Sequence, residues 1–219
     1  MPKRGMLEKF DVFVFDWDGT LANMRFVLRL SDMYKRAFVR KKNLNEYLEI
    51  EAAPDSAESR AIVKREERKN EVLSVLYDMM FSFNKPRLQK GSLEAVRYLR
   101  SRHKRVALLT NGAYYRVNKE IGHTGMNDMF EDVVSMRTMG SMKPDPRGLL
   151  HLVKRMNVDR KRVVYIGDSI DDILAARYAG IEECAIADGF DSEATLKRLK
   201  PNYLFRNMEQ FYRHLKTRE

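Results

Sequence analysis

The chain has 219 residues, of which 44% are hydrophobic and 33% are charged, and its formal net charge is +10 at pH 7. This length allows one domain with a full core, or one domain with an insertion. No apolar run reaches the roughly 18 residues of a membrane span, and residues 1–10 lack the apolar stretch of a signal peptide. The single cysteine, Cys184, excludes a disulfide within the chain. We therefore expect a cytoplasmic protein without a membrane partner.

The positive charge raises nucleic acid or an anionic substrate as possible partners. The basic residues, however, lie in short clusters along the chain, at 40–42, 64–65, 100–105 and 160–162. Several clusters stand beside acidic neighbours or at expected helix ends, where cations interact favourably with the helix dipole. The distribution therefore favours a solvated surface over a nucleic-acid footprint.

The first predicted strand, 12–15, is an apolar run typical of a strand buried on both faces. Asp16 and Asp18 follow it and, in an extended chain, point to the same side at the carboxyl end of the strand, where open α/β sheets bind ligands. Because two like charges this close repel each other, the pair predicts a metal site, with Gly19 letting the backbone bend close to it. An ordinary surface turn is the alternative.

Residues 22–88 read as helices only, with aromatic and aliphatic residues at helical spacing. Pro86 marks the return, since the residue before a proline is driven out of helix. We therefore expect a small helical domain at 22–88, inserted into a core domain of residues 1–21 and 89–219. The methionine and aromatic stripe of the insertion is expected to form its own core rather than a ligand site.

From about residue 91 onward, helices and strands alternate. We expect a helix before the strand 105–109, a helix from 114 that stops near Gly122, and a helix capped by Asp145 with Pro146 at its first position. A helix at 169–179 should end at Gly180, and two further helices should follow. The other expected strands are 132–136, 162–166, 184–187 and 203–205. Repeated βα units imply a parallel sheet with helices on both faces.

Three further polar sites fall at the expected active edge of this sheet. Thr110, Asn111 and Gly112 offer a hydroxyl and backbone amides at the start of a helix, an arrangement that suits an anion, although Asn-Gly is also a turn signal. Lys143 stands near the start of the helix that follows Pro146, where most lysines are merely solvated.

The last polar site follows the strand that ends before Gly167. Asp168 comes first, and Asp172 lies one helical turn later on the same face. Carboxylates at a helix N-terminus can be simple caps. Three within five residues, counting Asp171, favour a site for a hard cation.

Taken together, these sites resemble the four motifs of the haloacid dehalogenase superfamily, in its phosphatase branch with a helical cap, of the phosphoglycolate phosphatase type. The resemblance covers nearly the whole chain. The first motif, Asp-x-Asp-Gly-Thr, is matched at 16–20, the second at Thr110, the third at Lys143, and the fourth, Gly-Asp-x-x-x-Asp, at 167–172. Asp171 is an additional carboxylate whose role stays open.

The resemblance implies a Rossmann-like α/β core and an aspartyl-phosphate mechanism. Asp16 would be the nucleophile, and Asp18 would protonate the leaving oxygen and then activate water. Mg²⁺ would be held by Asp16, the backbone carbonyl of Asp18 and Asp168, with Asp172 as a further ligand or a support for one. Lys143, the Thr110 hydroxyl and the Asn111 amide would hold the phosphoryl oxygens.

Three functions remain open. A Mg²⁺-dependent phosphatase acting on a small soluble phosphorylated metabolite, as a monomer or homodimer, is the favoured interpretation. A phosphomutase of the β-phosphoglucomutase type shares all four motifs. A basic nucleic-acid-binding module without turnover is the third, and the intact Asp16, Asp18, Lys143 and Asp168 argue against it. The sequence does not select the phosphate ester.

Overall fold

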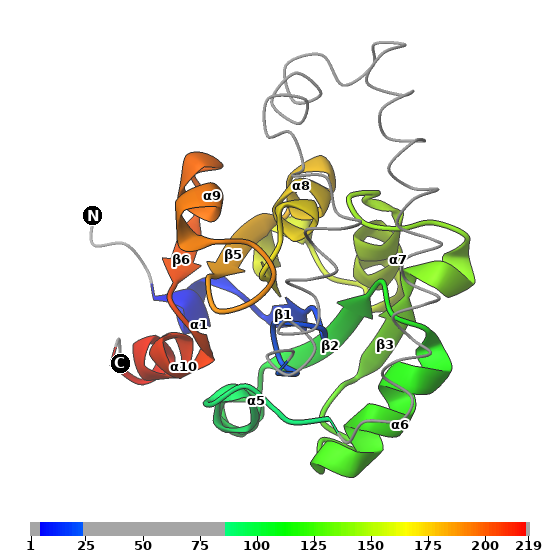
Figure 1. Cartoon of the computed structure of the whole chain (residues 1–219), viewed down its shortest axis with the longest axis horizontal. Helices are drawn as coiled ribbons and strands as arrows, with labels where there is room; N and C mark the ends of the chain where they lie inside the picture. Colours follow the sequence, from blue (N-terminus) through cyan, green and yellow to red (C-terminus); the bar gives the residue numbers. More distant parts are fainter. Residues whose placement is uncertain (1–4, 24–85, 218–219) are drawn as a thin grey trace, which may run out of the picture.

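A computed structural model describes residues 5–23 and 86–217. Its centre is a parallel sheet of six strands in the order β3-β2-β1-β4-β5-β6 (Figure 1). The strands are β1 (Val12–Phe15), β2 (Arg105–Thr110), β3 (Asp132–Ser135), β4 (Val163–Gly167), β5 (Glu182–Ile186) and β6 (Tyr203–Phe205). The predicted α/β class with a parallel sheet is confirmed.

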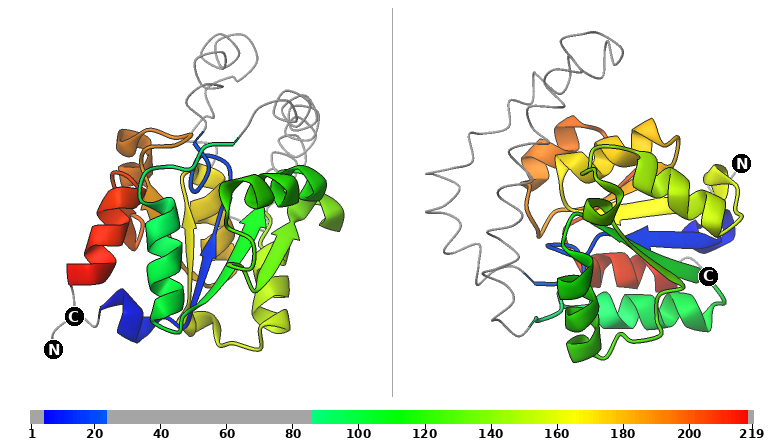
Figure 2. Two further views of the ribbon diagram at one scale, coloured as in Figure 1. Left: turned by 90° about the horizontal axis from the view of Figure 1, so that it is seen from below. Right: turned by 90° about the vertical axis from the view of Figure 1, so that its right-hand side faces the viewer.

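Helices cover both faces of this sheet, as the right-hand view in Figure 2 shows. The helices are α1 (Met6–Lys9), α5 (Ser92–Ser101), α6 (Tyr114–Thr124), α7 (Arg147–Arg155), α8 (Ile170–Tyr178), α9 (Glu193–Arg198) and α10 (Met208–Thr217), with short 3₁₀ turns η1 (Met136–Met139) and η2 (Arg160–Arg162). Buried residues of α1, α5, α6 and α10 pack on one face. Those of α7 and α8 pack on the other, and α9 packs against α8 and β5.

The central strand β1 shows why its residues form a doubly buried strand. Phe13 and Phe15 belong to the core on one face, and Val12 and Val14 belong to the core on the other, as the two-residue period of a strand requires. β1 pairs with β2 on one side and with β4 on the other. The chain therefore adds β2 and β3 on one side of β1 and then returns to add β4, β5 and β6 on the other side. The carboxyl end of β1 is therefore the switch point at which open α/β sheets bind ligands.

Helix bounds differ from the predicted ones for α6 and α7, and α8 is one residue shorter at each end than the predicted 169–179. Gly122 lies inside α6, and the helix ends instead before Gly125, which takes the left-handed conformation with φ of 70°. The predicted stop at Gly122 is wrong because Gly125 is the residue that adopts the positive φ of a helix end. The helix after Pro146 begins one residue later than predicted, and the Asp145 carboxylate accepts a hydrogen bond from the Arg147 backbone amide at 2.8 Å.

Of the predicted helical insertion at 22–88, residues 24–85 lie outside the described residues, and the domain division stays a prediction. The described ends of this segment meet. Ala22 and Leu88 form an antiparallel bridge, and the Asn23 amide donates to the Arg87 carbonyl. The chain thus leaves and re-enters the core at one place, directly after the loop that carries Asp18. No helix of the described part is long and apolar enough to span a membrane.

Candidate active site

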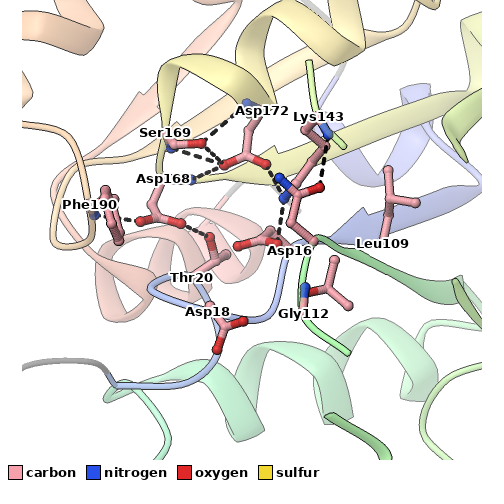
Figure 3. Close-up of polar contacts among 12 residues, drawn as sticks. Asp16, Asp18, Thr20, Leu109, Gly112, Lys143, Asp168, Ser169, Asp172 and Phe190 are labelled. Atoms are coloured by element: carbon pink, nitrogen blue, oxygen red, sulfur yellow. Dashed lines mark hydrogen bonds and ion pairs between the residues drawn. The ribbon is translucent and has the colours of Figure 1, made fainter. Parts of the chain in front are cut away.

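Polar side chains gather at the carboxyl edge of the sheet, around the end of β1. Asp16 follows β1 directly, and Asp168 follows the neighbouring β4. Lys143 reaches the same point from the loop between η1 and α7, and Asp172 from the first turn of α8. Figure 3 shows the four side chains converging. The structure therefore brings together four residues that lie up to 156 positions apart in the chain (172 − 16).

The Lys143 ammonium bridges two carboxylates. Its Nζ atom donates to Asp16 Oδ1 and to Asp172 Oδ1, each at 2.6 Å (Figure 3). The same atom lies 3.1 Å from the Tyr165 hydroxyl. The side chain is only 4% exposed. Burial lowers the pKa of this lysine, but the charges of Asp16 and Asp172 outweigh that effect and hold the pKa well above its usual value. Lys143 is therefore a fixed positive charge beside Asp16.

Two residues support Lys143. The Asn111 side-chain oxygen accepts a hydrogen bond from the Lys143 backbone amide at 2.8 Å, which ties the loop of Lys143 to the end of β2. The Tyr165 hydroxyl lies 2.9 Å from Asp172 Oδ1. Tyr165 was missed by the sequence reasoning, and the only signal for it is a hydroxyl within an otherwise apolar strand.

Asp172 is bound by the protein on both of its oxygens. Its Oδ2 atom accepts from the Ser169 hydroxyl at 2.6 Å and from the backbone amides of Ser169 and Asp168 at 3.0 and 3.2 Å. Ser169 and Asp172 thereby form a capping box that begins α8. Burial raises the pKa of Asp172, but the charge of Lys143 together with the hydrogen bonds from Lys143, Ser169 and Tyr165 outweighs it and lowers the pKa below its usual value. Asp172 therefore acts as an ionised anchor for Lys143.

Asp168 is held by hydrogen bonds from two loops. The Thr20 hydroxyl donates to Oδ1 at 2.7 Å, and the Phe190 backbone amide donates to Oδ2 at 2.5 Å. The loops approach so closely that a Cβ atom at Gly19 would lie 2.3 Å from Asp168 Oδ2 and one at Gly189 would lie 2.1 Å from it. Gly19 also has a φ of 92°, which side chains other than hydrogen rarely tolerate. Both glycines therefore make room for this carboxylate.

The three carboxylates fit a divalent cation. Asp16, Asp168 and Asp172 each offer an oxygen atom, and these atoms lie within 4.8 Å of one another. Burial raises the pKa of Asp16 well above its usual value. Three carboxylates and one ammonium, that of Lys143, leave a formal charge of −2 in this buried group (−3 + 1). A hard cation with oxygen ligands, such as Mg²⁺, would offset that charge.

Without divalent cations, we expect stability to fall as pH rises from about 4 to 7. Burial and the neighbouring Asp172 raise the pKa of Asp168 to about 7. The folded state then keeps a proton that the unfolded chain, with an Asp pKa of about 3.9, has already released, so the free energy of unfolding decreases across this interval, by on the order of 3 kcal/mol.

Thermal melts in excess chelator at pH 5 and pH 8 measure this effect. Asp168→Asn removes the contribution of Asp168 and should reduce the dependence, to which Asp16, whose pKa is also raised, still contributes. Mg²⁺ should restore the stability of the unsubstituted protein at pH 8. A melting temperature that rises from pH 5 to pH 8, or the same slope with and without Asp168, would contradict the expectation.

The Asp18 side chain lies outside the carboxylate group. Its oxygens Oδ1 and Oδ2 accept from the two terminal nitrogens of Arg116, on α6, at 3.0 and 2.5 Å. Arg116 in turn donates to Glu120 at 2.9 Å. Arg116 and Glu120 were missed by the sequence reasoning, and the i, i+4 spacing of an arginine and a glutamate is the only signal for them, one that is common on helix surfaces.

Thr110 and Asn111 lie beside the Lys143 loop. The Thr110 hydroxyl accepts a hydrogen bond from the Gly112 amide at 2.9 Å, so its own hydrogen is not used in this contact. The turn is held further by Ser135, which donates to the Gly112 carbonyl at 2.7 Å. Asp171 is buried in α8, and the group formed by Asp16, Asp168 and Asp172 does not include it.

Comparisons with known proteins point to one family. The profile described as haloacid dehalogenase-like hydrolase matches residues 10–180. A phosphoglycolate phosphatase of Psychrobacter arcticus is 33% identical over 101 residues, which cover 46% of this chain and 44% of that protein. The chain spans about half the length of the curated relatives it matches.

Solved structures share the fold. The structure of a predicted phosphoglycolate phosphatase from Haemophilus somnus aligns with a TM-score of 0.66 at 20% identity, covering 93% of this chain and 97% of that one. The structure of a candidate β-phosphoglucomutase from Thermotoga maritima aligns with a TM-score of 0.67 at 22% identity, covering 94% and 99%. At these identities the alignments show a common fold.

Proposed function

This chain belongs to the haloacid dehalogenase-like hydrolase family, and we propose that it is a Mg²⁺-dependent phosphatase that hydrolyses a small phosphorylated metabolite through an aspartyl-phosphate at Asp16. The observation that carries the proposal is the buried contact between Asp16 and Lys143, 2.6 Å long, within a group of three carboxylates. A carboxylate beside a fixed ammonium can attack a phosphoryl group whose negative oxygens the same ammonium attracts.

In the first step, an Asp16 oxygen attacks phosphorus, the bond from phosphorus to the ester oxygen breaks, and Asp18 transfers a proton to that oxygen. In the second step, Asp18 takes a proton from water, and the resulting hydroxide attacks phosphorus, so that inorganic phosphate and the Asp16 carboxylate are released. General acid and base catalysis by one carboxylate thus serves both steps.

Lys143, the Thr110 hydroxyl and the Asn111 backbone amide would hold the phosphoryl oxygens. Lys143 is suited to this role because it is fixed between Asp16 and Asp172 and keeps its charge. The Asn111 side-chain oxygen accepts from the Lys143 backbone amide, so the proposed contact of Asn111 with the phosphoryl group is made through its backbone.

Mg²⁺ would be held by Asp16, the backbone carbonyl of Asp18 and Asp168. When bound, the cation reduces the repulsion between the attacking carboxylate and the phosphate. Asp172 supports this site from its position beside Lys143, since hydrogen bonds already engage both of its oxygens.

A small phosphorylated metabolite is the proposed substrate, by analogy with relatives that are named phosphoglycolate phosphatases. The phosphomutase alternative uses the same residues, but a hydroxyl of a second sugar phosphate rather than water attacks the phosphoenzyme. A nucleic-acid module is disfavoured because basic residues of the predicted clusters are engaged with acids: Arg105 with Glu131, and Arg162 with Asp11.

A phosphate-release screen over phosphorylated metabolites tests the proposal, and the same samples test its metal dependence. We expect release with Mg²⁺, loss of at least about 100-fold in excess chelator, and recovery when Mg²⁺ is restored, because the charge of −2 would otherwise repel the phosphate. Full activity in excess chelator would contradict the metal site. Interconversion of sugar phosphates without release of phosphate would favour the phosphomutase.

A further inference from the structure

Hydrogen bonds connect Trp17 and Asp18, the two residues that follow the proposed nucleophile Asp16, to Arg116 and Glu120 on α6. The Trp17 indole nitrogen donates to Glu120 Oε2 at 2.6 Å, and Arg116 donates to the same oxygen at 2.9 Å. Arg116 then binds both oxygens of Asp18. Since Trp17 and Asp18 are neighbours in the chain, two consecutive side chains of the segment that follows Asp16 are hydrogen-bonded to α6.

The packing leaves the guanidinium of Arg116 little freedom. The Arg116 side chain is 3% exposed, and a Cβ atom at Gly112 would lie 2.3 Å from its Nη2 atom and 3.1 Å from Asp18 Oδ2. The missing side chain of Gly112 therefore makes room for the ion pair directly beside the turn that begins with Thr110. The pair lies between the nucleophile loop and the turn proposed to bind phosphate.

Attachment of the loop to α6 does not by itself explain why Arg116 binds both oxygens of Asp18. The hydrogen bond from Trp17 to Glu120 already joins the loop to α6. The two bonds from Arg116 add something different, because a planar guanidinium that contacts both carboxylate oxygens fixes the direction of that carboxylate. A carboxylate that must take a proton from water in the second step depends on such a direction.

We infer that Arg116 is a positioning residue for Asp18: its guanidinium, supported by Glu120, sets the orientation of the carboxylate that serves as general base for water in the second step. This inference rests on the proposed phosphatase mechanism. The hydrogen bonds of Arg116 to both oxygens of Asp18 make this role one that acts through Asp18.

A double-mutant cycle on the isolated steps tests the inference. Labelled p-nitrophenyl phosphate and rapid acid quenching would give the rates of phosphoenzyme formation and hydrolysis for the unsubstituted protein, Arg116→Met, Asp18→Asn and the double variant. We expect Arg116→Met to slow hydrolysis on the order of 10²-fold, so that phosphoenzyme accumulates. In the Asp18→Asn background the same change should have little further effect, because residues that act through one another are not additive.

Arg105→Met is the matched control. Arg105 also binds both oxygens of one carboxylate, that of Glu131, but does so at the amino end of β2, away from the site. Its loss should leave both rates unchanged. Arg116→Lys, which keeps the charge but not the two-pronged geometry, should recover part of the hydrolysis rate.

A merely structural Arg116 would give a different pattern. Loss of this buried ion pair lowers the melting temperature in either case, so the rates decide: the kinetic effect of Arg116→Met would then multiply with that of Asp18→Asn, which would overturn the inference. If Arg116→Met does not fold, Glu120→Gln replaces it, because glutamine still accepts from Trp17 but no longer pairs in charge with Arg116. Hydrolysis should slow in this variant, and an unchanged rate would overturn the inference.

The experiment also separates the two proposals. If the unsubstituted protein forms no phosphoenzyme and releases no phosphate, the proposed function fails, and the role of Arg116 fails with it. If phosphoenzyme forms and turns over but the two substitutions act independently, only the role of Arg116 is wrong.

Discussion

Asp16→Asn is expected to abolish both turnover and the phosphoenzyme. The amide lacks the negative charge that attacks phosphorus, and removal of a covalent nucleophile in other enzymes costs on the order of 10⁶-fold in turnover. The fold should survive, because the asparagine oxygen can still accept a hydrogen bond from Lys143, which also keeps its contact with Asp172.

The measurements are phosphate release and acid-quenched labelling with a phosphorylated substrate, with a melting curve as the control for folding. Asp16→Ala should give the same result and excludes recovery by deamidation of the asparagine. A labelled protein, or turnover within about 10-fold of the unsubstituted level, would show that another residue is the nucleophile.

Asp18→Asn is expected to separate the two steps. It keeps the nucleophile but removes both the proton donor and the base that activates water, contributions that are typically about 10²- to 10⁴-fold each. With an aryl or acyl phosphate, whose leaving group needs little protonation, the first step should slow less than the second. An acid-stable label that hydroxylamine removes should therefore accumulate on this variant.

Comparison of Asp16→Asn with Asp18→Asn distinguishes the nucleophile from the general acid and base. The label should be present in Asp18→Asn and absent from Asp16→Asn under the same conditions. The Arg116 contact also predicts a small loss of stability in Asp18→Asn, since the buried guanidinium exchanges a charged partner for a neutral one. A label on residue 18, or equal residual turnover in both variants, would reverse the proposed roles.

Several features of this fold follow from local patterns and so could be predicted from the sequence. The apolar run before Asp16 is a strand buried on both faces, and the alternation of helical and strand periods implies parallel pairing. Parallel strands bring their carboxyl ends to one edge, and the pairing of β1 with β4 in the structure then places the residues that follow them close together. The gathering of Asp16, Asp168 and Asp172 is a consequence of that geometry.

The exact ends of the elements were less predictable. Gly122 and Gly125 both allow a helix to stop, and the sequence shows no preference between them. In the fold, α6 continues to Thr124, and Gly125 takes the positive φ. Similarly, the predicted strand 132–136 ends at Ser135, since Met136 begins a 3₁₀ turn and is buried against the core.

The sequence by itself determined the parallel α/β core and the edge at which the acidic residues meet, because strand direction and the two-residue period are local properties of the chain. Only the tertiary structure decided how each carboxylate is held: Asp16 and Asp172 by Lys143, Asp168 by Thr20 and Phe190, and Asp18 by Arg116. Asp18 and Arg116 are 98 positions apart. Gly112, in the turn after β2, leaves room for their contact because it has no side chain. Such a pairing depends on the relative placement of segments that are distant in the chain, and no periodicity within any one of them specifies it.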